Sequence, residues 1–186
     1  MKIMDLAKSH TIVIYDSGKG FFGSRAVFMM RAFGHPRVFL LDGGLHKWMK
    51  DGRATSQCDY ADYDAEFNYD LNSEQLIDYQ RMKEVSESGE VQIIENRPHP
   101  SVQATGTIPG AICIPAPAFI NEDNTLMSRE QLESLFREMG VDSDKPMAFS
   151  CGGGIMASYA LNAAAKAGFG GTMYLYDGSW SEYSAR

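Results

Sequence analysis

The chain contains two copies of one pattern, and this internal repeat restricts its fold more than any other feature. The segments VIYDSGKGFFGSRAVFMMRAFGHPRVFLLDGG and MAFSCGGGIMASYALNAAAKAGFGGTMYLYDGS align at a spacing of 134 positions (154 − 20 for two glycines). The matched pairs are Gly18 with Gly152, Gly20 with Gly154, Ser24 with Ser158, Ala26 with Ala160 and Gly34 with Gly168. After a one-residue insertion, an Asp-Gly pair matches at a spacing of 135 (177 − 42). The chain therefore contains one supersecondary unit twice.

Each copy has the pattern of a strand, a Gly-rich loop, a helix and a second strand. The helix of each copy ends at a glycine, Gly34 or Gly168, where a left-handed backbone costs little. The predicted strands are residues 11–15 and 37–41 in the first copy and residues 146–149 and 172–176 in the second. A strand–helix–strand unit of this length predicts parallel pairing through a right-handed crossover.

More elements of the same kind precede the second copy. They are a helix over residues 72–87 with Ser73 as its N-cap, a strand over 91–95, a strand at the end of 107–114, and a helix over 128–139. The last helix is amphipathic, with one face formed by Leu132, Leu135, Phe136 and Met139. We therefore predict an α/β fold in which a parallel sheet has helices on both faces.

The repeat also predicts how the chain divides into domains. Residues 71–186 hold all the elements of one complete domain, and residues 57–70 read as an interdomain linker. Only residues 1–10 precede the first strand of the first copy, too few for the elements found before the second copy. Residues 1–56 are thus expected to be the back half of a similar domain in a shortened chain. Its unpaired strand edges predict mobility or self-association.

Composition excludes several classes of function. A net charge of −7 and a pI near 5.0 disfavour nucleic acid as a partner. No apolar run reaches the ~20 residues that span a bilayer, so no membrane association is expected. The three cysteines, Cys58, Cys113 and Cys151, fit neither a disulfide framework nor zinc-ligand spacing, which favours a reducing intracellular compartment. No metal or cofactor is implied.

Five motifs give the chain a family resemblance. In chain order they are GHPRVFLLDGGLHKW, IIENR, TGTIPGAICIP, SCGGGIMAS and YLYDGSWSEY. Together they resemble rhodaneses and 3-mercaptopyruvate sulfurtransferases, and the cysteine loop followed by DGSW is the most specific part. The resemblance implies two similar α/β domains, with the active cysteine in the second. Ser17 stands at the cysteine position of the first copy (151 − 134), as expected for a silent domain.

The resemblance also implies the reaction. Cys151 would accept sulfur from a small anionic donor, thiosulfate or 3-mercaptopyruvate, and pass it through a persulfide to cyanide or to a thiol, including one on a thioredoxin-like protein. The compartment would be cytoplasmic or mitochondrial. The family's usual His is here Thr107, and its Asp before the arginine is here Glu95-Asn96. Only Arg97 can match the family's donor-binding arginines, which leaves the choice of donor open.

The residues around Cys151 suit this chemistry. Cys151 follows a strand and opens a loop of three glycines, Gly152, Gly153 and Gly154, before a helix that begins with Ile155 and Met156. The N–H groups of such a loop and the helix dipole favour a thiolate and would hold a persulfide anion. We therefore predict Cys151 as an exposed nucleophile and these five neighbours as its substrate-binding loop. Arg97 would bind the donor anion or, alternatively, form an ion pair with Glu95 or Asp177.

Other residues near the loop have structural interpretations. Asp177 and Ser179 are expected to cap the helix that follows them, with Trp180 packed behind the loop. Cys113 is expected in the apolar core and Cys58 in the linker. A Cys-x5-Arg phosphatase is excluded, because Ala157 stands six positions after the cysteine. A shortened or divergent family member with a binding or regulatory role remains the alternative to an enzyme.

Overall fold

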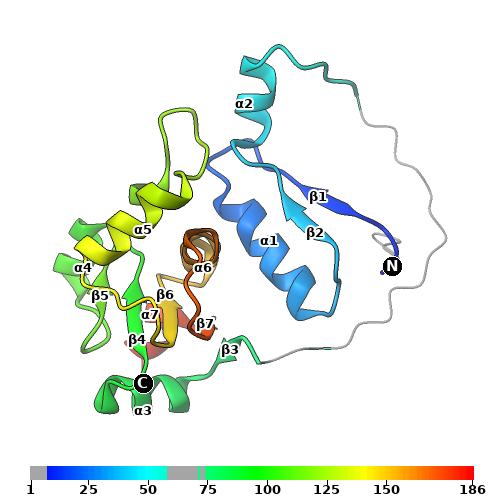
Figure 1. Ribbon diagram of the computed structural model, residues 1–186. Coiled ribbons are helices and arrows are strands. Elements are labelled where there is room, and N and C mark those ends of the chain that lie inside the picture. Colours follow the sequence, from blue (N-terminus) through cyan, green and yellow to red (C-terminus); the bar gives the residue numbers. More distant parts are fainter. Residues whose placement is uncertain (1–7, 58–70, 72–73) are drawn as a thin grey trace.

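The computed structural model describes residues 8–57, 71 and 74–186, and its strands form two parallel sheets (Figure 1). In the smaller sheet, β1 (Ile12–Ile14) pairs with β2 (Val38–Leu40). The larger sheet has the strand order β3-β7-β6-β4-β5. Its strands are β3 (Leu76–Ile77), β4 (Gln92–Glu95), β5 (Ile112–Cys113), β6 (Met147–Ser150) and β7 (Met173–Tyr176). Every pairing is parallel, as the repeat predicts.

Helices cover both faces of the five-stranded sheet, which confirms the predicted fold class. The helices of the described residues are α1 (Phe21–Ala32), α2 (Gly44–Lys50), α3 (Tyr79–Ser88), α4 (His99–Thr105), α5 (Arg129–Glu138), α6 (Ile155–Ala167) and α7 (Ser179–Tyr183), with a 3₁₀ turn at Ala116–Phe119. On one face, α1, α5 and α6 share a buried apolar cluster with the sheet. On the other, α3 and α7 pack on a second cluster that includes Met82, Ile93 and Tyr176.

The two copies have the predicted structure in detail. β1–α1–β2 and β6–α6–β7 are both strand–helix–strand units with parallel strands. Each helix begins after a left-handed glycine, with φ of 84° at Gly20 and 77° at Gly154. Each ends at another, with φ of 81° at Gly34 and 84° at Gly168. Residues with a Cβ seldom adopt this conformation, so the matched glycines preserve the same turns in both copies.

The first copy packs against the larger domain through its helix, since α1 and α6 lie side by side (Figure 1). The ring of Phe21 meets Tyr159 edge to face, with centroids 5.1 Å apart. Polar contacts flank this interface: Arg25 pairs with Asp177 at 2.6 Å, and the Leu126 amide donates to Asp42 at 2.7 Å. The first copy therefore packs through α1, Arg25 and Asp42 against the part of the chain that forms the five-stranded sheet.

The outer part of the small sheet is exposed. Val13, Tyr15 and Phe39 keep 51–59% of their surface accessible. The predicted mobility or self-association of residues 1–56 stays a prediction, and most of the predicted linker (58–70) lies outside the described residues.

The helix predicted over residues 72–87 is partly wrong. Leu76 and Ile77 form β3 along the edge of β7, because pairing with the sheet overrides local helix propensity. Helix α3 begins only at Tyr79, after Asp78, whose carboxylate accepts from the Arg81 amide at 2.8 Å. Ser73, the predicted N-cap, is outside the described residues. The helix predicted at 128–139 is confirmed, with Ser128 in a capping box, although Met139 is 39% exposed.

Tyr159 should make the fold sensitive to alkali. Its hydroxyl is buried without a partner among the described residues, and burial, reinforced by Asp42 and Asp16, raises its pKa. A raised folded-state pKa contributes stability that is complete below the unfolded pKa of about 10 and is lost as pH rises above it. We predict that Tyr159→Phe changes the free energy of unfolding by less than about 1 kcal/mol at pH 7 but loses less stability than wild type above pH ~10.

Urea denaturation at both pH values checks this prediction. Tyr15→Phe serves as the control, because Tyr15 is 59% exposed and should follow wild type throughout. Equal alkaline losses in wild type and Tyr159→Phe would contradict the prediction.

Candidate active site

Cys151 directly follows β6, an interior strand between β4 and β7, and its residue surface is only 1% accessible. The predicted exposed thiol is therefore wrong for this structure. The residue belongs to the apolar cluster shared with α6, and the segment after β7 closes over its loop. The Trp180 amide donates to the Cys151 carbonyl at 2.9 Å, and the Ser181 amide donates to Gly152 at 3.2 Å.

The three glycines of the loop differ in what they require. Only Gly154 has a left-handed backbone, and a Cβ there would lie 2.8 Å from Asp177 Oδ1 and 3.1 Å from Arg25 Nη1. A Cβ on Gly152 or Gly153 would meet nothing within 4 Å. The predicted conformational need for glycine is thus confirmed at Gly154 alone, while the other two leave open space beside the cysteine.

The side chain of Ser179 fixes the loop through hydrogen bonds to its backbone. Its hydroxyl accepts from the amides of Cys151 at 3.2 Å and Gly154 at 3.0 Å, and donates to the Tyr176 carbonyl at 2.8 Å. The residue is fully buried and has a positive φ of 50°. The prediction that Asp177 and Ser179 cap α7 is wrong, because Gly178 occupies the N-cap and no side chain caps it. No sequence pattern indicates this contact, which joins residues 28 positions apart.

Several other amides of the Cys151 loop donate no hydrogen bond to a described residue. Within the described part of the chain, the N–H groups of Gly152, Gly153, Ile155 and Met156 have no hydrogen-bond partner. Ile155 and Met156 are half-buried in the first turn of α6. These groups sit where the sequence predicted the substrate-binding loop, and their contact with substrate stays a prediction.

The Gly-rich loop of the first copy binds the carboxylate of Asp16. Asp16 stands at the position of Ser150 (150 − 134). Its Oδ1 accepts from the amides of Gly18 and Gly20, and its Oδ2 from that of Gly23, each at 3.0 Å. A carboxylate thus fills this loop, which makes it an anion-binding nest. Ser150 supplies no carboxylate to the second loop, and its own hydroxyl is buried without a partner among the described residues.

Arg97 is surrounded by protein groups. Its Nη2 contacts Glu95 Oε2 at 2.8 Å and donates to the Gly106 carbonyl at 2.7 Å, while Nη1 donates to Thr105 at 2.9 Å. Its guanidinium also lies 4.8 Å from the Trp180 ring centroid, and only 5% of the residue is exposed. The ion pair with Glu95, the predicted alternative, is present.

Arg97 and Cys151 also lie on opposite faces of the sheet. Side chains alternate along β4, so Glu95 follows Ile93 toward the α3/α7 side, and Arg97, just beyond the strand, contacts Glu95. Cys151 belongs to the cluster on the α1/α5/α6 side. Trp180, on which Arg97 stacks, packs on the α3/α7 side as well. This geometry gives no support to direct binding of a donor anion by Arg97.

Asn96 is a residue that the sequence analysis missed. By the same alternation it follows Ile94, on the Cys151 side of the sheet. Its Nδ2 donates to the Ile114 carbonyl at 2.8 Å, but its Oδ1 is buried and has no partner among the described residues. A buried polar atom without a partner costs about 1–3 kcal/mol, which makes it a candidate for contact with a bound molecule or water.

The other cysteines remain poor nucleophile candidates. Burial, followed by the charge of Glu95, raises the pKa of Cys113, although Arg97 partly opposes this shift. Cys113 therefore favours the protonated thiol. It is half-buried on the edge strand β5, so its predicted position in the apolar core is wrong. Cys58 lies outside the described residues.

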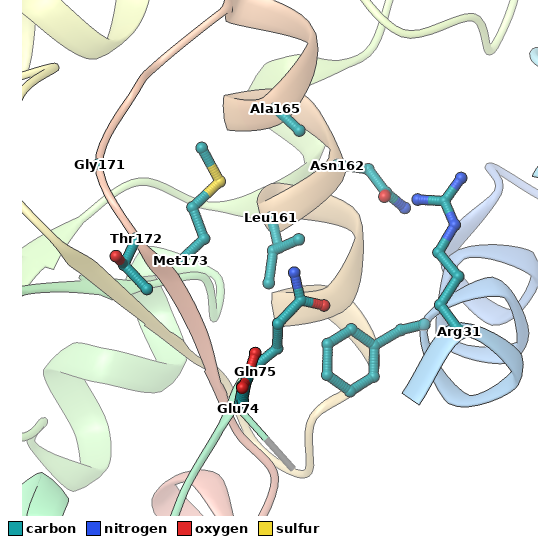
Figure 2. A pocket seen from close by; sticks show the side chains of 10 residues that line it. Arg31, Glu74, Gln75, Leu161, Asn162, Ala165, Gly171, Thr172 and Met173 are labelled. Atoms are coloured by element: carbon teal, nitrogen blue, oxygen red, sulfur yellow. The ribbon is translucent and has the colours of Figure 1, made fainter. Parts of the chain in front are cut away.

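A cavity of about 410 Å³ lies elsewhere, between α1, α6 and the start of β7 (Figure 2). Arg31 extends toward Asn162 at its mouth, with Gln75 and Thr172 on other walls. None of its lining residues belongs to the Cys151 loop. Across the described ranges, no helix is long and apolar enough to cross a membrane, and no three His, Cys, Asp or Glu side chains gather as metal ligands.

Comparison with known proteins gives consistent matches. The rhodanese-like domain family model matches residues 1–51 and 78–186. The chain is 33% identical to thiosulfate sulfurtransferase of Gallus gallus over 94% of its own length and 64% of that protein's. It is 32% identical to 3-mercaptopyruvate sulfurtransferase of Escherichia coli K12, covering 100% and 69%, and 34% identical to the Homo sapiens enzyme of that name, covering 94% and 63%.

The fold matches as well. The crystal structure of the Escherichia coli 3-mercaptopyruvate enzyme SseA aligns with a TM-score of 0.86 at 32% identity, over 96% of this chain and 70% of that one. The chain thus spans about two thirds of the length of the relatives it matches.

The surroundings of Arg97 predict a large structural effect of its removal. Arg97→Ala would leave the fully buried Glu95 carboxylate without its cation, and breaking such a pair costs about 3–5 kcal/mol of unfolding free energy. Urea denaturation measures this loss. Arg137→Ala is the control, since its pair with Glu133 is exposed and should contribute less than about 1 kcal/mol. Equal small losses in both variants would show that Arg97 does not stabilise the site.

Proposed function

Because the chain belongs to the rhodanese-like domain family, we propose that it is a sulfurtransferase that carries sulfur as a persulfide on Cys151. The observation that supports this most directly is the contrast between the two loops. In the first copy the nest is filled by Asp16. In the second, Cys151 stands at the mouth of the matching nest, and several of its amides bond to no described residue.

The proposed reaction has two half-reactions. In the first, the Cys151 thiolate attacks the outer sulfur of thiosulfate, a new S–S bond forms, and sulfite leaves with the electron pair of the broken S–S bond. With 3-mercaptopyruvate, the C–S bond breaks instead, and the electron pair stays on carbon as the enolate of pyruvate, which takes up a proton. In the second, the acceptor attacks the outer sulfur and Cys151 leaves as thiolate.

The loop amides supply the electrostatic part of this mechanism. The donor, the departing sulfite or enolate and the persulfide are all anionic, and fixed N–H dipoles stabilise such charge without reorganising. Gly152 and Gly153 have open space on the side where a Cβ would stand, so the loop next to the cysteine is not crowded at these two positions. The loop carries no charged side chain and resembles the 3-mercaptopyruvate type more than the thiosulfate type, whereas the lack of a second arginine near Arg97 points the other way. Relatives of both names are similar to the chain.

Access to the sulfur requires movement. Cys151 is 1% exposed while Gly153, two positions on, is exposed. A donor therefore reaches the thiol only after the loop, or the first copy packed beside it, shifts. The same burial is the observation that favours the alternative function, a binding or regulatory module in which Cys151 is a packed core residue.

The proposed partners and compartment follow from the chemistry. The acceptor is cyanide or a thiol, including a thiol on a thioredoxin-like protein, and the donor is a small anion. Cys113 and Cys151 are both free thiols, which supports a reducing setting such as the cytoplasm or the mitochondrion.

Intact-protein mass spectrometry tests the proposal. Incubation with either donor and no acceptor should add one sulfur to the wild-type protein, and subsequent cyanide should remove it and release thiocyanate. Cys113→Ser, the matched control, should still gain the sulfur, whereas Cys151→Ser should not. Initial rates with the two donors would then identify the substrate. A protein that gains no sulfur from either donor, with Cys151 intact and reduced, would favour the binding-module function instead.

A further inference from the structure

Across the interface, a side chain of each copy contacts the Gly-rich loop of the other copy. Arg25 in α1 and Tyr159 in α6 occupy matching positions (159 − 134). Tyr159 packs on the loop of the first copy, with its ring 3.1 Å from where a Cβ on Gly20 would stand. Arg25 packs on the loop of the second, with Nη1 at 3.1 Å from the corresponding point on Gly154. Each helix thus contacts the left-handed glycine of the other copy's loop.

Arg25 and Tyr159 occupy matching positions in the two copies, but their side chains differ in chemistry. The residue that reaches the loop of Asp16 is an aromatic ring, and the residue that reaches the loop of Cys151 is a guanidinium. Arg25 Nη2 pairs with Asp177 Oδ1 at 2.6 Å, and its side chain is 22% exposed. Its Nη1 is buried and has no partner among the described residues.

Arg25 and Asp177 together enclose Gly154. Both side chains lie within 3.1 Å of the position that a Cβ on this glycine would take. The pair therefore fixes two segments at once: the turn at Gly154 and the chain that leaves β7 at Asp177. A charge-assisted contact of this kind restricts both of its partners more than a neutral contact does.

These two segments are the ones that hold Cys151. The hydroxyl of Ser179, two positions after Asp177, accepts from the amides of both Cys151 and Gly154. A shift of the Asp177 segment or of the Gly154 turn would break the hydrogen bonds of these two amides to Ser179. Arg25 thus acts on Cys151 through Gly154 and Ser179, without a direct contact to the sulfur being required.

We propose that Arg25 is a positioning residue for sulfur transfer at Cys151, supplied by the copy that has no cysteine of its own. The inference rests on the proposed function, since it assigns Arg25 a role in the same site. By fixing the Gly154 turn and the Asp177–Ser179 segment, Arg25 orients the loop amides toward the developing anion. The first copy is therefore part of the active site.

Steady-state kinetics of sulfur transfer, with donor and cyanide both supplied, test this role. Arg25→Gln and Asp177→Asn should each lower kcat about 10-fold and leave the donor KM within about 2-fold, because misplaced amides act on the transition state more than on donor binding. The double variant should be no slower than either single variant, since both remove one interaction. Arg25→Lys should recover part of kcat. Arg31→Gln, on the same helix but bonded to the Val38 carbonyl, is the matched control and should stay within about 2-fold.

Hydrogen exchange supplies a readout that does not depend on activity. The amides of Cys151 and Gly154, which both bond to Ser179, should exchange faster in Arg25→Gln than in wild type, and no faster in Arg31→Gln. If wild type forms no persulfide, the proposed function fails while this measurement still decides whether Arg25 holds the loop. A lowered Tm with unchanged kcat and unchanged exchange at these two amides would overturn the inference and leave Arg25 as an interface residue only.

Discussion

The rest of this structure depends on how the amides of a Gly-rich loop find acceptors. A strand that ends in the middle of a parallel sheet turns into a helix through a left-handed glycine, and several N–H groups then converge. The first copy satisfies three of them with Asp16. The second satisfies two with the hydroxyl of Ser179. The amides that remain without a described partner in the second copy are the anion-binding groups that the proposed sulfur transfer would use.

This difference adds a second reason, beside Ser17 at the position of the cysteine, why the first copy is expected to be silent in the proposed reaction. A carboxylate fixed inside the nest competes with any incoming anion at no cost in association entropy, and it would repel a persulfide formed nearby. In the second copy the acceptor is Ser179, a residue outside the loop, and not a carboxylate such as Asp16. The turn is still fixed, and the remaining loop amides stay without a described partner. The serine has an unfavourable backbone conformation, with φ of 50°, a kind of strain that proteins retain at functional sites.

The repeat made most of the fold predictable, because the matched glycines mark turns whose left-handed conformation is local. The helix at 72–87 was misjudged because Leu76 and Ile77 obtain their structure from β7, nearly 100 positions away. Cys151 could be named from its loop, but its burial depends on Trp180 and Ser181 closing over it. Arg97 was predicted to bind an anion from its place at the edge of the sheet, because the sequence does not show its contacts with Glu95, Thr105 and Gly106. The contacts of Arg25 with Asp177 and of Ser179 with the Cys151 loop had no sequence signal, since they join distant segments.

The crossed contacts of Arg25 and Tyr159 have a consequence for how such a chain can evolve. After a duplication, two copies usually become free to diverge, because each retains its own core. Here the loop of each copy is in contact with a residue of the other, so a change at Gly154 is constrained by Arg25 and a change at Gly20 by Tyr159. The copy without a cysteine could lose its chemistry, but its helix stays under selection for as long as the other copy's loop must keep its shape.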